Sequence, residues 1–246
     1  MRVARTLFIS DLHLTGTHPE SADRFFRFLE REAADACELY VLGDLFEYWV
    51  GDDELLTPQH DPLPGRVGSA FAVLRDRGIV VRIMHGNRDF FIGEGFCRAS
   101  GAQIINDPAV MDVGGTPTLL MHGDTLCTDD VDYQAWRQTC RAPEWQREFL
   151  AKPLGERRRI ADGLRETSRD MARTKPTEIM DVTPRGVRDA FRTHGVARLI
   201  HGHTHRPARH QLEVDGISCE RWVLPDWYGT GGYIEVADGN LKLVLF

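Results

Sequence analysis

Short apolar runs that end in polar residues recur along the chain. They cover residues 6–11, 39–44, 80–87, 118–122 and 197–203. Apolar runs of this length are typical of buried strands. Because α/β proteins collect functional side chains beyond the carboxyl ends of their strands, the five polar ends predict one shared site.

Helical patterns occupy the intervals between these runs. Ser21 is the predicted N-cap of a helix whose apolar residues recur at three- and four-residue spacing. A second helix is expected over residues 67–74, with Gly78 as its C-terminal stop. In a third, Thr183 is a predicted cap followed by proline, and Gly195 ends the helix.

The late part of the chain departs from strand–helix alternation. Three β-like segments lie around residues 218–224, 232–236 and 241–246. The pattern predicts an α/β sandwich with one late, antiparallel sheet edge. Residues 130–175 also break the alternation, being helical, basic and aromatic. We expect one domain over residues 1–246, with 130–175 inserted as a helical cap.

Composition narrows the functional classes. A hydrophobic fraction of 42% in 246 residues is enough for a substantial core. The net charge of −7 argues against a generic nucleic-acid binder. Residues 141–175 carry ten Lys or Arg and six Asp or Glu, a net +4. This segment fits either a local anionic partner or a solvated helical face, and both readings remain open.

The chain carries no pattern of export or membrane insertion. Its N-terminal residues run directly into a predicted strand, and its apolar runs are too short to span a bilayer. The five cysteines are scattered without a CxxC spacing, so reduced thiols in the cytoplasm are expected.

Seven side chains at the polar strand ends predict a metal centre. They are Asp11, His13, Asp44, Asn87, His122, His203 and His205. Oxygen and imidazole donors suit Mn²⁺, Fe²⁺ or Zn²⁺, and two such ions together hydrolyse phosphate esters and anhydrides. Asp11 and His13 are two residues apart, which on an extended strand points both to one face. Individually, most of these residues are explained as turn, cap or core residues; their combination favours ligation.

The order D-x-H, G-D, G-N-R-D, H-G and G-H-x-H closely resembles that of the calcineurin-like binuclear metallophosphoesterases. The resemblance covers most of the chain and implies a β-sandwich flanked by helices. It also implies that Asp44 bridges two ions. The first ion would be held by Asp11, His13, Asp44 and His205, and the second by Asp44, Asn87, His122 and His203.

One position distinguishes the chain from most of that family. Arg88 stands where most members have a histidine. Arginine cannot act as a general acid at neutral pH, but it binds phosphate bidentately and stabilises charge. Such a site suits a good leaving group, such as the phosphate of a pyrophosphate bond.

Several stretches resemble the branch of the family that cleaves UDP-2,3-diacylglucosamine in lipid A biosynthesis: residues 43–53, 85–90, 121–130, 179–182 and 200–207. The resemblance implies two Mn²⁺ ions and attack of metal-activated water on the α-phosphorus. The products would be UMP and 2,3-diacylglucosamine 1-phosphate. It also implies peripheral association with the anionic cytoplasmic face of a bacterial inner membrane, alongside a cytoplasmic population.

The same resemblance implies roles for particular residues. Asp44, Asn87, Arg88 and His203 would be catalytic, and the substrate contacts would be Asn87, Arg88, Asp130, Tyr133, Arg165, Ser168, Lys175 and His203. Ala172 stands where some members have a polar asparagine, which bears on one substrate hydrogen bond and not on the chemistry.

Two other functions are alternatives to this one. Another binuclear metallophosphoesterase would act on a soluble nucleotide or phosphodiester, and Arg88 with the basic segment argues against it. A binding scaffold that has lost catalysis should have broken metal motifs, whereas all seven ligand positions are intact. No nucleic acid and no protein partner are predicted. The sequence does not decide whether the three arginines at 157–159 contact membrane, substrate or solvent.

Overall fold

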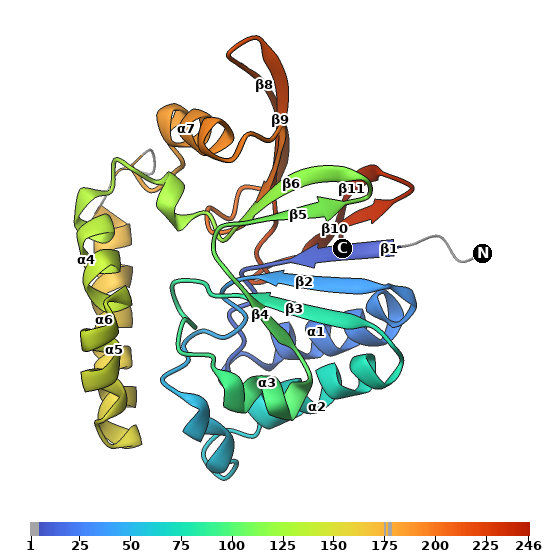
Figure 1. The fold of residues 1–246 in the computed structure, drawn as a ribbon. Coiled ribbons are helices and arrows are strands. Elements are labelled where there is room, and N and C mark those ends of the chain that lie inside the picture. The colour runs from blue at the N-terminus through green and yellow to red at the C-terminus, as the bar shows by residue number, and fades with distance from the viewer. Residues whose placement is uncertain (1–4, 175, 177–178) are drawn as a thin grey trace.

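Two stacked β-sheets form the centre of the molecule in the computed structural model, which describes residues 5–174, 176 and 179–246 (Figure 1). The first sheet has the strand order β11-β10-β1-β2-β3-β4, and the second β5-β6-β7-β9-β8. The strands are β1 (Arg5–Ile9), β2 (Glu38–Leu42), β3 (Val80–Met84), β4 (Gln103–Ile105), β5 (Ala109–Val113), β6 (Thr116–Met121), β7 (Arg198–His201), β8 (Ala208–Val214), β9 (Ile217–Val223), β10 (Gly232–Ala237) and β11 (Asn240–Leu245). The predicted α/β sandwich is confirmed.

Alternation along the strands builds a core on both faces of each sheet. On β1, Leu7 and Ile9 join the cluster under the helices, while Phe8 joins the cluster between the sheets. Neighbouring residues of a strand point to opposite faces, so one strand supplies both clusters. On β6, Leu119 and Leu120 divide in the same way between the outer and the inner side of the second sheet.

Helices cover the outer faces of both sheets. Helices α1 to α3 pack on the first sheet, and α7 packs on the second (Figure 1). The helices are α1 (Pro19–Arg31), α2 (Leu63–Asp76), α3 (Glu94–Ser100), α4 (Val131–Arg141), α5 (Pro143–Leu150), α6 (Leu154–Thr174) and α7 (Pro184–His194), with the short 3-10 helices η1 (Ala33–Asp35), η2 (Asp52–Leu56) and η3 (Asp124–Leu126).

Two predicted helix starts have different outcomes. Helix α7 begins as expected: the Thr183 hydroxyl accepts the Gly186 N–H at 3.0 Å, and Gly195 ends the helix at φ 62°. The prediction of Ser21 as the N-cap of α1 is wrong, since that helix begins at Pro19. Ser21 lies inside the first turn and donates its hydroxyl to the Trp227 carbonyl at 3.1 Å.

Helices α4, α5 and α6 stand as a column beside the sandwich, on the side to which the carboxyl ends of β1 and β2 point (Figure 1). They lie between β6 and β7 in the chain, and we call them the helical segment. Two of its three consecutive arginines are engaged within the protein: Arg157 pairs with Asp53, and Arg158 pairs with Glu54. Among the described residues, none of the helices is apolar over a length that would cross a bilayer.

Candidate metal centre

The predicted ligands lie on tight turns just beyond the strands. Five of the seven have left-handed backbones: Asp11 (φ 55°), His13 (48°), Asp44 (53°), His203 (67°) and His205 (56°). Such angles are uncommon for residues other than glycine and are found where function maintains them. The prediction that strand alternation points Asp11 and His13 to one face is therefore wrong: β1 ends at Ile9, and both residues lie on a left-handed turn.

Glycines in the motifs allow the turns to approach one another. A Cβ at Gly86 would lie 2.1 Å from Asp44 Oδ1, and a Cβ at Gly202 would lie 2.3 Å from Asp11 Oδ2. Real side chains do not tolerate such distances. These two motif glycines are thus required by the close packing of ligand-bearing turns.

One group of ligand atoms gathers around Asp11, His13 and His205. The Nε2 atoms of the two histidines are 3.4 Å apart. The Nε2 of His205 is also 3.4 Å from Asp11 Oδ1. That carboxylate oxygen is buried and has no hydrogen-bond partner among the described residues.

A second group joins the first through Asp44. Its Oδ2 lies 3.7 Å from His13 Nε2 and 3.8 Å from His122 Nε2. The Asn87 Oδ1 lies 3.0 Å from His122 Nε2 and 3.2 Å from His203 Nδ1. The structure therefore brings all seven predicted ligands into one cluster, with Asp44 between its two halves.

The electrostatics of the cluster favour cations. Burial works to lower the pKa of His122, but the Asp44 and Asp124 carboxylates outweigh it and raise that pKa to about 9. Burial, together with the charge of His122, lowers the pKa of His203 to about 4. A buried group of carboxylates that draws protons onto a neighbouring imidazole attracts metal ions in the same way.

Two buried carboxylates behind the ligands had no predicted role. Asp89 accepts the N–H groups of Leu45 at 2.7 Å and Gly86 at 2.9 Å, and so ties two ligand turns together. Burial and the nearby Asp44 carboxylate raise the pKa of Asp89 to about 6. Asp124 accepts from Tyr133 at 2.6 Å and from Arg137 at 2.7 Å. Both aspartates stand in the motifs, in G-N-R-D and H-G-D, which was the available signal.

Two further residues on the His13 side were missed by sequence reasoning. Glu47 lies 3.3 Å from His13 Nδ1, and Tyr228 stacks on the His13 ring with a centroid distance of 4.9 Å. The Tyr228 hydroxyl donates to Glu47 at 3.0 Å. These two residues are 181 positions apart, and no local pattern reports such a pairing.

Some of the predicted substrate contacts lie near the cluster, others make contacts within the protein, and one lies outside the described residues. Arg88 and Ser168 approach one another, with 3.4 Å between Nη2 and Oγ, and the Tyr133 ring lies 6.0 Å from that of His203. Arg165 points to Glu47, and Asp130 caps α4 by accepting the Tyr133 N–H at 3.2 Å. Lys175 and the side chain of Ala172 lie outside the described part of the structure.

Comparison with known proteins places the chain among phosphoesterases. The family model described as calcineurin-like phosphoesterase matches residues 4–207. The chain is 45% identical over 238 residues to the UDP-2,3-diacylglucosamine hydrolase of Cellvibrio japonicus, covering 97% of each chain. The proteins of the same name from Marinobacter nauticus and Klebsiella pneumoniae are 48% and 45% identical, with 93% or more of each chain covered. A solved archaeal phosphodiesterase aligns with a TM-score of 0.48 at 11% identity, covering 98% of this chain and 99% of its own.

Proposed function

Since this chain belongs to the calcineurin-like phosphoesterase family, we propose that it hydrolyses the pyrophosphate bond of UDP-2,3-diacylglucosamine in lipid A biosynthesis. The observation that carries this function is the near full-length likeness to curated relatives that bear the name of that hydrolase. The products would be UMP and 2,3-diacylglucosamine 1-phosphate.

The donor set fits divalent metal, and we assign it two Mn²⁺ ions, with Fe²⁺ and Zn²⁺ as the other candidates. Asp11, His13, Asp44 and His205 would hold one ion, and Asp44, Asn87, His122 and His203 the other. The unsatisfied Asp11 Oδ1 and the facing Nε2 atoms of His13 and His205 support this assignment, because a shared cation satisfies all three. When bound, such a pair of ions activates water and neutralises phosphoryl oxygens.

The residues around the donors bind and orient the diphosphate. The backbone N–H of Arg88 donates to Asp44 Oδ1 at 2.9 Å, and its guanidinium Nη2 lies 3.4 Å from Ser168 Oγ on α6. A guanidinium at this place stabilises the charge that develops as the bond breaks. Asn87 Oδ1 and His203 Nδ1 lie 3.2 Å apart within the cluster. In the reaction, water oxygen bonds to the α-phosphorus, and the electron pair of the broken bond leaves with the sugar phosphate.

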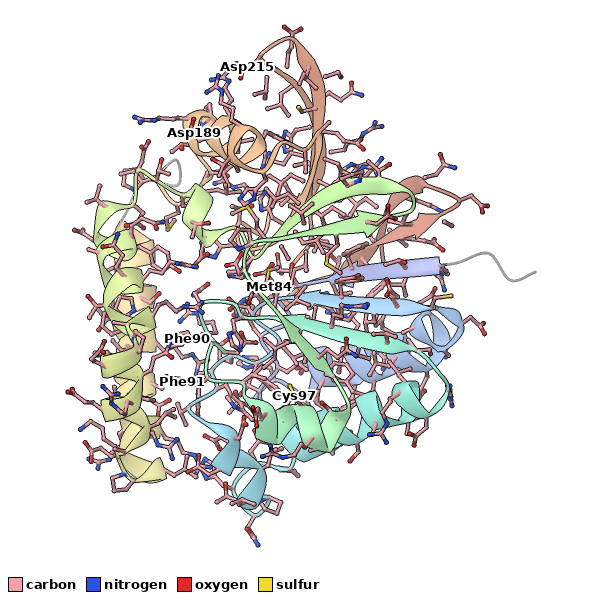
Figure 2. All side chains as sticks on the ribbon, in the orientation of Figure 1. Met84, Phe90, Phe91, Cys97, Asp189 and Asp215 are labelled. Carbon is pink, nitrogen blue, oxygen red and sulfur yellow. The ribbon has the colours of Figure 1, made fainter. Side chains whose placement is uncertain are left out.

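The helical segment supplies a place for the acyl chains, and we assign residues 130–175 the role of a cap. Phe91 stacks on Trp145 and Phe149, with centroid distances of 6.2 Å and 4.8 Å. Figure 2 shows Phe90 and Phe91 on the side of the core that faces the helices. Arg141 lies over the Phe90 ring, 4.5 Å from its centroid. A group of aromatic side chains bordered by an arginine suits a ligand with an anionic head and apolar chains.

The outer surface of the helical segment supports peripheral binding to the anionic cytoplasmic face of the inner membrane. Apolar side chains and arginines of these helices are exposed: Trp136, Leu150, Leu164 and Met171, with Arg147 and Arg159. Each basic residue near an anionic surface contributes about 1 kcal/mol. Of residues 157–159, we assign only Arg159 to this role, since its two neighbours pair within the protein.

Hydrolysis of UDP-2,3-diacylglucosamine by metal-stripped protein, with and without Mn²⁺, tests the function. In ¹⁸O water, label in UMP is expected, since the water oxygen joins the α-phosphorus. Label in the lipid phosphate would move the attack to the other phosphorus. Loss of lipid hydrolysis alongside retained cleavage of bis(p-nitrophenyl) phosphate would refute the substrate and favour a soluble phosphodiester instead.

A further inference from the structure

Glu47 is the point at which three separate parts of the chain meet beside the candidate metal centre. It is 5% exposed and follows β2 by five residues. Its Oε1 lies 2.6 Å from Nε of Arg165 on α6. Its Oε2 accepts the Tyr228 hydroxyl at 3.0 Å and lies 3.3 Å from Nδ1 of His13. One buried carboxylate thus contacts a ligand turn, the helical segment and the loop before β10.

The orientation of the His13 ring places one of its nitrogens beside Glu47. The Nε2 atom of His13 faces His205 and Asp44 in the cluster, so Nδ1 is the nitrogen that faces outward. That Nδ1 is buried and has no hydrogen-bond partner in the described chain, and Glu47 is the carboxylate placed beside it. The stacked Tyr228 ring, 15° from parallel, limits rotation of the imidazole.

The other histidines that present Nε2 to the cluster share this arrangement. The Nδ1 of His122 lies 3.0 Å from the Leu42 carbonyl oxygen, and the Nδ1 of His205 lies 3.8 Å from Asp226 Oδ2. A histidine that ligates metal through one nitrogen commonly donates its other N–H to an oxygen, which fixes the tautomer and strengthens the ligand. Glu47 occupies the corresponding place for His13.

We propose that Glu47 is a positioning residue: it accepts the Nδ1 hydrogen of His13 and, through Arg165, makes divalent-metal affinity depend on the placement of the helical segment. The inference rests on the metal centre of the proposed function and not on the lipid substrate. Coupling of this kind is reciprocal. A ligand that displaces Arg165 from Glu47 changes the affinity for metal by a certain factor, and bound metal changes the affinity for that ligand by the same factor.

Mn²⁺ titration of metal-stripped protein, followed by calorimetry and by the spin-resonance signal of free Mn²⁺, tests the proposal without any substrate. Glu47→Ala should weaken one of two Mn²⁺ sites by about 10- to 100-fold. Glu47→Gln, which keeps an acceptor oxygen and loses the charge, should fall between that variant and the wild type. Arg165→Met should weaken the same site less than Glu47→Ala does, and the double variant should lose less than the sum of the two.

The neighbouring ion pair provides a matched control. Arg158 of α6 pairs with Glu54 just as Arg165 pairs with Glu47, but Glu54 has no contact with a predicted ligand among its described interactions. Arg158→Met and Glu54→Gln should therefore bind Mn²⁺ as the wild type does. Equal loss in these controls would reduce Glu47 to a general anchor of the helical segment and overturn the proposal.

A second readout covers the case in which Glu47→Ala fails to fold. In the isosteric Glu47→Gln variant, ¹⁵N shifts of the imidazoles report whether His13 still holds its hydrogen on Nδ1. An unchanged His13 tautomer together with unchanged Mn²⁺ affinity in folded Glu47→Gln would refute the positioning role. Wild-type protein that binds no Mn²⁺ would instead refute the metal centre itself, so the two failures are distinguishable.

Discussion

At the scale of single residues, the candidate site combines backbone strain with unfavourable charge. Asp44 has a left-handed backbone at φ 53°, is 2% exposed, and raises the pKa of Asp89 by its charge. Each of these features costs stability in the absence of a cation. Stability has been exchanged for function at this position, as is common at sites built for ligands.

Asp44→Asn separates the effect of the charge from the effect of the left-handed backbone. Asparagine tolerates a left-handed backbone and keeps an oxygen for the Arg88 N–H, so the fold should be retained. Without metal, the variant should be more stable than the wild type by about 1 kcal/mol, because the repulsion between the Asp44 and Asp89 carboxylates is gone. Metal-dependent hydrolysis should be lost. Urea unfolding in a chelator and turnover with Mn²⁺ measure both; wild-type turnover in the variant would contradict the bridging role.

A methyl group at Gly86 should be far more harmful than one at Gly65. At Gly86 the new Cβ meets the Asp44 backbone nitrogen at 2.3 Å, whereas at Gly65, in α2, nothing lies within 4 Å. Gly86→Ala should lower stability by about 3 kcal/mol and abolish hydrolysis, through overpacking at the ligand turn. Gly65→Ala should raise stability by about 0.5–1 kcal/mol. Melting temperatures check both, and a Gly86→Ala protein as stable as Gly65→Ala would refute the argument.

At the scale of elements, α4 is anchored to the candidate site by a buried charge. Arg137 on α4 pairs with Asp124, which is fully buried, and with Asp107 at 3.4 Å. The N–H of His122 donates to the same Asp107 at 3.2 Å. The start of the helical segment and a predicted ligand thus share one carboxylate.

Arg137→Met should destabilise the protein by about 3 kcal/mol, because it leaves Asp124 buried without its cation. The exposed pair Arg192–Asp215 offers the contrast: its side chains are 48% and 59% exposed, and Arg192→Met should leave the stability nearly unchanged because solvent screens the pair. The denaturant midpoints of the two variants, each compared with that of the wild type, measure the two changes in stability. Equal effects would show that burial does not distinguish the two pairs.

Elements with strong local signals were predicted well from the sequence. The five polar strand ends gave the strands that surround the site, and Thr183 with Gly195 marked both ends of α7. The prediction of Ser21 as an N-cap was wrong because its hydroxyl donates to the distant Trp227 carbonyl. A local sequence pattern does not reveal such a long-range hydrogen bond. The conformation of Asp11 and His13 was missed for a related reason: contacts between turns impose the left-handed backbone.

The surroundings of the ligands were the least predictable part of the site. Tyr228 reaches Glu47 only because the sheets bring together residues 181 positions apart. Arg165 was predicted to contact substrate, and its contact with Glu47 requires the packing of α6 against the segment after β2. Metal-ligand motifs are encoded in short stretches, whereas the residues that hold the ligands in place are brought together by the tertiary fold.

At the scale of the whole molecule, the predicted ligands come from both sheets. Asp11, Asp44 and Asn87 follow strands of the first sheet, while His122 and His203 follow strands of the second. Metal that binds this arrangement binds only when the sheets are packed, so it should stabilise the entire fold.

Mn²⁺ at 100 times its dissociation constant should therefore raise the free energy of unfolding by about 2.7 kcal/mol for each site. Urea titrations with Mn²⁺ and with a chelator measure the change. The dependence of the free energy on urea should stay the same, because the native structure buries the same surface in both conditions. A midpoint that does not move with Mn²⁺, in protein shown to bind it, would contradict a centre shared between sheets.

The position of β1 has a consequence for synthesis of the chain. It lies between β2 and β10, pairing Thr6 with Glu38 on one side and with Val236 on the other. When the first two hundred residues have been synthesised, four of the six strands of the first sheet exist, β1 to β4, but the edge of β1 that pairs with β10 is still unpaired. An unpaired apolar strand edge invites association with other chains. This edge of the nascent protein stays unpaired until the hairpin of β10 and β11 has been synthesised. Truncation before β10 should therefore yield aggregates.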